Sequence, residues 1–277
     1  MPKTAVLFAA LLLILASVSS AETLKFAPLP METAETVAAQ WKPLLEHLKK
    51  VCDIELDFDY STSNEQILGK FEAGQLDLAY LGPLPYLRLK DRFPQAQPLV
   101  IFHEANGQPS YTCALVVAAE SDLQPEQLTG HKIALTQPLS TCGFFSIAGL
   151  LQQAEIRLEE TRYRYLGPHD AVALAVAGGE FDAGGLKSAI ARKYASLGLR
   201  IIAETAPLPG LALIANSARV SEERMESIRR ALLTADEATR KTWGDNIRHG
   251  VSAADDEDYA EARKLPYLAP IPAQGNF

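Results

Sequence analysis

Short apolar strands alternate with helical segments along most of the chain, and this alternation restricts the possible folds more than any other feature. Strands are predicted at 24–27, 54–60 and 76–81, with helices at 33–50 and 63–73 between them. The segment 54–60 reads Ile-Glu-Leu-Asp-Phe-Asp-Tyr, which is the period-two pattern of a half-buried strand. Because each helix connects two strands, the succession predicts an α/β fold with a mainly parallel sheet covered by helices.

A second set of alternating strands and helices follows. Its predicted strands are 112–118, 132–135, 161–165, 181–184 and 199–204, and its predicted helices are 145–155, 170–177 and 189–196. A strand at 211–215 and a helix at 221–242 then return the chain to the first set. The second set is therefore inserted into the first.

This order predicts two α/β lobes with crossings near Tyr111 and Glu204. Residues 22–110 and 205–277 form lobe 1, and residues 111–204 form lobe 2. Two lobes joined by two short crossovers can close around a ligand like a clamshell. Two independent domains are the alternative that the pattern leaves open.

The first 21 residues read as a signal peptide. Lys3 supplies the positive charge, residues 5–18 form an apolar run that is short for a membrane span, and the small residues 19–21 suit a signal peptidase. The mature chain is then exported to the periplasm and begins near Glu22. An N-terminal membrane anchor is the alternative.

The charge of the mature chain excludes some classes of partner. The whole chain has 26 basic and 34 acidic residues, so removing Lys3 leaves a net charge of −9. An acidic surface disfavours nucleic acid and anionic lipid, and no second apolar run predicts membrane insertion after signal cleavage. A small anionic ligand remains possible because local donors decide its binding.

Three cysteines, Cys52, Cys113 and Cys142, are too few for a disulfide scaffold. The chain has no CxxC, HExxH or clustered histidine motif, so no metal or cofactor is predicted. It also lacks a G-x-S-x-G elbow and a glycine-rich phosphate loop, so a Cys or Ser hydrolase is only a remote alternative and bound ATP is not expected.

The stretch TQPLSTCGFF, residues 136–145, is the best candidate for a binding site. A hydroxyl-rich loop leads through Gly143 directly into the apolar segment 144–151, which is predicted to be helical. The start of a helix presents free backbone N–H groups and a partial positive charge, both of which suit an anion. An ordinary cap and turn is the structural alternative.

Five segments occur in an order that resembles a known family. They are DYSTSNEQILGKFEAGQLDLAYLGPLPYL, YTCALVV, LTGHKIALTQPLSTCGF, LGPHDAVALAVAGGEFDAG and DDEDYAEARKL. Together they resemble the PhnD-like periplasmic phosphate, phosphite and phosphonate-binding proteins of ABC transporters. The resemblance covers nearly the whole mature chain. It implies the type II periplasmic-binding-protein clamshell and a protein that captures a small oxyanion for an ABC permease.

The resemblance also implies a set of ligand-contacting residues. These are Tyr60, Tyr111, Ser140, Thr141, Cys142, His169 and, more weakly, Asp182. The tyrosines can give phenolic hydrogen bonds, and the histidine can donate from a ring nitrogen. Core packing for the tyrosines, helix capping for His169 and a strand end for Asp182 are the alternatives. The turn Leu81-Gly82-Pro83 is expected to shape the wall of the cleft in lobe 1.

Cys142 stands where the family has a serine, and Cys113 is predicted to share a strand face with Tyr111. Three readings stay open. Cys142 can act as a small polar residue whose backbone N–H binds the anion. The two cysteines can form a disulfide in an oxidising periplasm. They can also be thiol ligands for arsenite, as the resemblance to an arsenite-sensing AioX-like relative implies, and the partner would then be the periplasmic sensor domain of a membrane histidine kinase.

Overall fold

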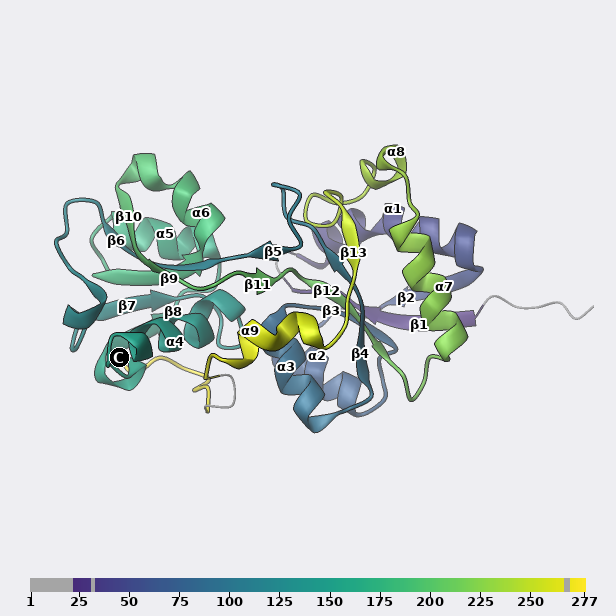
Figure 1. Cartoon of the computed structure of the whole chain (residues 1–277), viewed down its shortest axis with the longest axis horizontal. Coiled ribbons are helices and arrows are strands. Elements are labelled where there is room, and N and C mark those ends of the chain that lie inside the picture. The colour runs from purple at the N-terminus through teal and green to yellow at the C-terminus, as the bar shows by residue number, and fades with distance from the viewer. Residues whose placement is uncertain (1–21, 31–32, 267–269) are drawn as a thin grey trace, which may run out of the picture.

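The structure, a computed structural model, describes residues 22–30, 33–266 and 270–277. The predicted signal peptide, residues 1–21, lies outside the described residues. The described residues form two α/β lobes that lie side by side (Figure 1). None of the helices in these ranges is long and apolar enough to cross a membrane. The two-lobed α/β architecture is the one that the sequence predicts.

Lobe 1 is built on a six-stranded sheet in the order β13-β4-β12-β3-β1-β2. Its strands are β1 (Glu22–Ala27), β2 (Ile54–Phe58), β3 (Leu78–Leu81), β4 (Ala96–Phe102), β12 (Ala212–Asn216) and β13 (Val251–Ala253). β1 pairs in parallel with both β2 and β3, as the β-α-β-α-β succession predicts. β12 and β13 run antiparallel to their neighbours because the chain re-enters this sheet from lobe 2.

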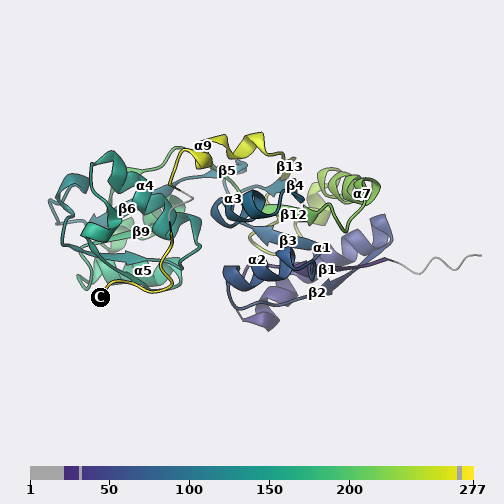
Figure 2. The same ribbon diagram turned by 90° about the horizontal axis from the view of Figure 1, so that it is seen from below.

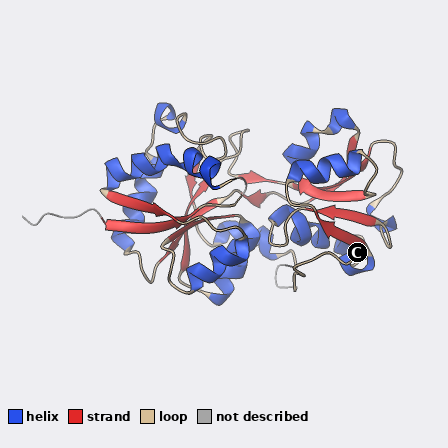
Figure 3. Ribbon diagram, turned by 180° about the vertical axis from the view of Figure 1, so that it is seen from behind, coloured by secondary structure: helices blue, strands red, loops and turns tan. Residues whose placement is uncertain are grey.

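Helices bury both faces of this sheet (Figure 3). The covering helices are α1 (Ala34–Cys52), α2 (Asn64–Glu72), α3 (Pro83–Arg92) and α7 (Glu222–Leu233). The short helix α8 (Glu237–Arg240) follows α7, and α9 (Ala260–Arg263) packs on α3. On one face Trp41 of α1 packs on Phe26 of β1, with ring centroids 4.6 Å apart. On the other face Phe71 of α2 and Tyr86 of α3 are fully buried. Burying each such side chain contributes about 1.5–3 kcal/mol to the free energy of unfolding.

Lobe 2 is built on a five-stranded sheet in the order β10-β6-β9-β7-β8. Its strands are β6 (Cys113–Ala118), β7 (Lys132–Leu135), β8 (Arg162–Tyr165), β9 (Ala183–Lys187) and β10 (Leu199–Glu204), and its helices are α4 (Ser146–Gln153), α5 (His169–Ala177) and α6 (Ser188–Lys193). β7, β8 and β9 are parallel to one another. One apolar core lies under α4, and a second lies under α5 and α6.

Two short strands connect the lobes. β5 (Ser110–Tyr111) enters lobe 2, β11 (Leu208–Pro209) leaves it, and the two pair antiparallel with Tyr111 opposite Leu208. The backbone N–H of Cys113 donates to Thr205 Oγ1 at 3.1 Å directly beside this ribbon. In Figure 2, β5 and α9 lie at one edge of the junction between the lobes. The lobes are therefore joined along one side.

The C-terminal segment departs from the predicted lobe boundaries. The sequence pattern assigns all of residues 205–277 to lobe 1, but residues 270–277 pack on lobe 2 instead. The Tyr163 backbone N–H of the edge strand β8 donates to Asn276 Oδ1 at 2.7 Å, and the Phe277 ring lies beside Phe181. An open sheet edge and an aromatic contact, neither visible in the local sequence, hold the segment there.

Candidate ligand site between the lobes

The parallel strands of both sheets end at the junction between the lobes. In lobe 2, β7 leads to Ser140, β8 leads to His169 and β9 ends at Lys187; in lobe 1, β2 leads to Tyr60 and β3 to Gly82. Ligands of open α/β sheets bind in the crevice outside the carboxyl ends of such strands. The junction is therefore the place where a ligand site is expected.

Thr141 makes a direct contact between the two lobes. Its Oγ1 accepts a hydrogen bond from the Leu84 backbone N–H, in the first turn of α3, at 3.2 Å. The Tyr111 hydroxyl also hydrogen-bonds to the Thr141 side chain, while burial raises the pKa of that phenol and keeps it protonated. A Cβ built on Gly82 would lie 3.2 Å from Thr141 Oγ1, so the backbone of Gly82 lies close to the Thr141 side chain.

The loop before α4 has a fixed shape. The chain makes a kinked turn, η2 (Thr141–Phe145), and the Ser146 hydroxyl donates to the Thr141 carbonyl oxygen at 2.6 Å. Gly143 is non-helical, with φ −89° and ψ −122°, and a Cβ there would lie 2.6 Å from Thr136 Oγ1. This close approach requires glycine.

The two site cysteines form a disulfide. Cys113 and Cys142 are bonded, with their Cα atoms 5.0 Å apart and both side chains buried. The bond ties the η2 turn to the first residue of β6, next to the hinge strand β5. With both sulfurs bonded to each other, neither is available as a thiolate ligand. The third cysteine, Cys52, is free and buried in lobe 1.

His169 begins α5 and is oriented by Lys187. Its Nδ1 accepts a hydrogen bond from the Lys187 backbone N–H at 3.1 Å, so in the neutral ring the proton is on Nε2. Burial, together with the nearby Lys187 charge, lowers the pKa of His169 to about 4. At neutral pH the ring is therefore uncharged and carries one N–H donor that it can offer to an acceptor.

Lys187 and Glu104 are site residues that the sequence reasoning missed. Lys187 Nζ lies 2.5 Å from Glu104 Oε2 and 4.7 Å from the centroid of the Tyr111 ring, so it crosses from lobe 2 to lobe 1. A basic residue at the end of the apolar strand β9 is the sequence signal that could have located Lys187. Glu104 lies in a loop whose pattern carries no such signal.

Several helices at the junction begin without a side-chain cap. The starts of α3, α5, α6 and the η2 turn have no side-chain cap, whereas α1, α2, α7 and α8 are capped by Thr33, Ser63, Ser221 and Asp236. Uncapped N–H groups need another acceptor. Thr141 provides one for α3. At the other starts an anion can accept from the N–H groups.

Ser140 and Tyr60 each follow a strand that ends at the junction. Ser140 is half-buried and directly precedes Thr141. Tyr60 follows β2 and packs half-buried on the core of lobe 1 beside Phe58. Tyr111, Thr141 and His169 form a connected group with the two cysteines, linked through Lys187 and the disulfide.

Asp182 lies at the opposite end of the lobe 2 sheet from the junction. It directly precedes β9, its Oδ2 accepts from the Lys132 backbone N–H at 2.8 Å, and the same atom lies 3.2 Å from His131 Nδ1. Because Lys132 begins β7, Asp182 is at the amino ends of these parallel strands. Its side chain binds the start of β7 at the end of the sheet that faces away from the junction, so Asp182 is not part of the candidate site.

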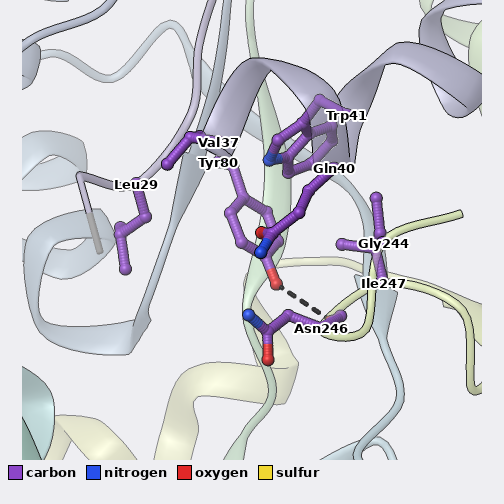
Figure 4. A pocket seen from close by; sticks show the side chains of 8 residues that line it. All are labelled: Leu29, Val37, Gln40, Trp41, Tyr80, Gly244, Asn246 and Ile247. Carbon is purple, nitrogen blue, oxygen red and sulfur yellow. Dashed lines mark hydrogen bonds between the residues drawn. The ribbon is translucent and has the colours of Figure 1, made fainter. Parts of the chain in front are cut away.

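Two pockets lie on the lobe 1 side of this region. One, of about 20 Å³, is enclosed by α1 and residues 244–247, where the Tyr80 hydroxyl donates to the Asn246 carbonyl oxygen at 3.4 Å (Figure 4). That volume holds about one water molecule, not an oxyanion. The other, of about 110 Å³, is lined by Lys187 and Glu104 and continues toward His103 and His249.

The pKa of His169 predicts how stability depends on pH. The unfolded chain protonates this histidine near pH 6.5 and the folded chain only near pH 4, so the unfolded state binds more protons between these values. The free energy of unfolding should therefore fall as the pH drops through this window, by at most about 1.4 kcal/mol per pH unit. Thermal melts of the protein and of His169→Gln between pH 7 and pH 4.5 measure this. In His169→Gln the stability should depend less on pH in this window, because the histidine contribution is gone. Equal slopes of stability against pH in both proteins would contradict the prediction.

Two α/β lobes on a two-stranded hinge, with helix starts from lobe 2 at the junction, define a type II periplasmic binding protein. The model of the family described as "ABC transporter, phosphonate, periplasmic substrate-binding protein" matches residues 26–259. The chain belongs to this family. Members of the family bind substrates for transport, and the family implies a periplasmic location.

Individual relatives agree with this assignment. The chain is 28% identical over 174 residues to the "Phosphate-import protein PhnD" of Mycolicibacterium smegmatis, a match that covers 59% of this chain and about half, 54%, of that relative. Its fold is similar to that of PhnD1 from Prochlorococcus marinus in complex with methylphosphonate, with a TM-score of 0.71, 18% identity and 88% and 96% of the two chains covered. XAC2383 from Xanthomonas citri bound to ATP gives a TM-score of 0.74, 19% identity, and 88% and 98% covered.

Proposed function

We propose that the protein captures a small phosphorus oxyanion, of the phosphonate, phosphite or phosphate class, between its lobes. The ligand oxygens accept from the uncapped N–H groups at the starts of η2 and α5, from the Ser140 hydroxyl and from His169 Nε2, while the Thr141 hydroxyl donates to Tyr111 and positions that phenol. Tyr60 and Tyr111 complete the site with phenolic donors. A tetrahedral oxyanion has enough acceptor positions to use donors from several directions at once.

One observation carries this proposal. The uncapped starts of η2 and α5 lie at the junction next to a neutral histidine with a free N–H donor, at the carboxyl ends of the parallel strands. Neutral donors and helix starts attract an anion without needing a charged side chain. The family to which the chain belongs and the relatives named for phosphate and methylphosphonate support the same ligand class.

The joined side of the lobes suggests how the ligand is held and released. The β5–β11 ribbon and the disulfide lie together on that side, so the lobes rotate about it and close on the ligand. The closed form is the one that a membrane permease of an ABC transporter recognises. Ligand capture and delivery in the periplasm then need only binding and release, with no covalent reaction at the site.

Ser140→Ala is expected to weaken binding without unfolding the protein. The variant removes one hydroxyl donor to a charged ligand, and such hydrogen bonds contribute about 1.5–3 kcal/mol, or roughly ten- to a hundredfold in the dissociation constant. Calorimetric titration with phosphate, phosphite, methylphosphonate and 2-aminoethylphosphonate measures the loss. Ser217→Ala is the matched control, because it removes a lobe 1 hydroxyl that donates to the Gln95 carbonyl oxygen instead of facing the junction. Unchanged affinity in Ser140→Ala would remove this residue from the site.

The arsenite hypothesis depended on two free thiols. The disulfide between Cys113 and Cys142 withdraws that support in the oxidised protein, and no other described feature favours arsenite or a sensory partner. Arsenite added to the calorimetric panel, with and without a non-thiol reductant, separates the two ideas. Binding of arsenite only after reduction would show that the reduced thiols are competent ligands. It would leave the oxyanion proposal intact for the oxidised protein.

A further inference from the structure

The ion pair between Lys187 and Glu104 is the most unusual charged feature of the junction. The two side chains come from different lobes, their charged atoms are 2.5 Å apart, and each is only about one-fifth exposed, at 21% and 19%. Most of the other ion pairs among the described residues involve at least one side chain that is a third or more exposed. A pair this sheltered is screened weakly by salt, so its charges act strongly on any ligand placed beside it.

Lys187 is held more firmly than Glu104. Its backbone lies in β9, with its N–H bonded to His169 and its Cα paired with Cys113 of β6, and its ammonium stacks on Tyr111. Glu104 lies in the loop between β4 and β5, whose tip from 105 to 109 is exposed. When a ligand competes for the pair, Glu104 is therefore the partner that moves and Lys187 the one that stays.

Lys187 also connects the oxyanion donors to the 110 Å³ pocket. The residue contacts His169 and Tyr111 on one side and lines the pocket on the other, together with Glu104. A ligand whose phosphorus group binds at His169 and the η2 turn can direct a substituent of a few atoms into this pocket. The first charged groups that such a substituent meets are the Lys187 ammonium and the Glu104 carboxylate.

We propose that Lys187 determines which substituted ligands the site accepts. Its ion pair with Glu104 keeps that carboxylate engaged, so amino-substituted phosphonates are excluded. The inference rests on the proposed function of the same site. Bare oxyanions and phosphonates with a neutral or anionic substituent are accepted, because Lys187 attracts them and Glu104 can move away. An ammonium substituent is disfavoured, because the fixed Lys187 charge repels it and both carboxylates that line the pocket are already paired, Glu104 with Lys187 and Asp245 with Arg248.

The test compares two ligands that differ by one ammonium group, ethylphosphonate and 2-aminoethylphosphonate, by calorimetric titration of the purified protein. The wild type should bind ethylphosphonate at least about tenfold more tightly. Lys187→Met keeps the stem that packs on Tyr111 and releases Glu104, and it should reverse or abolish this preference. Glu104→Gln should increase the affinity for phosphonoacetate, whose second group is a carboxylate.

Two further variants keep the result interpretable. Lys193→Met makes the same charge change on the exposed end of α6 and should leave the preference unchanged. The double variant Lys187→Met/Glu104→Gln removes the unpaired carboxylate, so it should not gain affinity for the amine. Thermal melts of every variant show whether a change in binding reflects loss of the fold, because a Glu104 left alone in a sheltered place is destabilising.

The outcomes distinguish this inference from the proposed function. Three results together support this inference. The wild type prefers ethylphosphonate, Lys187→Met loses that preference, and the double variant gains no affinity for 2-aminoethylphosphonate. Equal binding of the two ligands by the wild type overturns it, as does an unchanged preference in a folded Lys187→Met protein. Those two results leave the oxyanion function in place. Failure of the wild type to bind phosphate, phosphite and every phosphonate overturns the proposed function, and this inference with it.

Discussion

Replacing Cys113 and Cys142 together by alanine is expected to lower the free energy of unfolding by about 3–4 kcal/mol. The disulfide closes a loop of sequence separation 29, and loops of this length restrict the unfolded chain by about that amount. Urea unfolding of the oxidised protein and of the variant measures the difference. The free energy of unfolding of a native protein is only about 5–15 kcal/mol, so this loss is a large fraction of the total.

The same change should weaken ligand binding. The disulfide fixes the η2 turn to β6, and without it the N–H groups and hydroxyls of the turn lose their preorganised positions. A reductant should therefore lower both stability and affinity of the wild type and leave the alanine variant unaffected. Cys52→Ala is the control for removing a buried sulfur that has no disulfide partner. If the reductant shifts neither protein, the disulfide makes no contribution of this size.

Gly143→Ala is expected to damage the site. A Cβ at this position would lie 2.6 Å from Thr136 Oγ1 and 3.0 Å from the Gln137 carbonyl oxygen, and the second contact is with backbone that cannot turn aside. The loop must therefore shift. Overpacking of this kind costs roughly 1–3 kcal/mol of stability, and displaced donors should weaken oxyanion binding by at least about tenfold.

A second glycine supplies the control for Gly143→Ala. Gly69 lies inside α2, and a Cβ there has no atom within 4 Å. Gly69→Ala should therefore stabilise the protein, by about 0.5–1 kcal/mol, and leave binding unchanged. Melting temperatures and calorimetric titration of both variants give the comparison. An undamaged site in Gly143→Ala would mean that the loop before α4 does not hold the ligand.

Local sequence patterns predicted most of the elements. The alternation in 54–60 corresponds to β2, and Ser63 followed by an apolar period corresponds to the capped helix α2. The predicted helix 221–242 is shorter in the structure, because Asp236 begins a separate helix, α8, after α7 ends at Leu233. Caps and period-two patterns are local properties, so a single chain segment carries the whole signal.

Strand β4 shows where local reasoning fails. The sequence patterns predict no strand at 96–102. Pro98 cannot donate to a sheet, so a strand in the interior of a sheet is unexpected there. In the structure the register with β12 shifts next to Pro98, opposite Ile214, and the strand lies inside the sheet between β12 and β13. The partner strands are more than a hundred residues away, so only the tertiary fold reveals how the proline is tolerated.

The candidate site divides in the same way. The sequence alone indicated the hydroxyl-rich loop at 136–145, and the family resemblance added His169 and Tyr111, because these lie in segments with recognisable local order. It left the Cys113–Cys142 disulfide as one of three readings, and it could not join Lys187 to Glu104 or place Asp182 at the far end of the sheet. Each of those depends on which strand ends meet across the junction.

The sequence by itself determined the alternation of strands and helices, the two-lobed order, the acidic charge and the loop that begins α4. Hydrophobic period, turn residues and charge are set by neighbours in the chain, so no folding is needed to see them. Only the tertiary structure decided the disulfide, the side on which the lobes are joined and the ion pair beside His169. Those features exist because sheet pairing and the burial of both sheet faces bring together residues that are distant in the sequence.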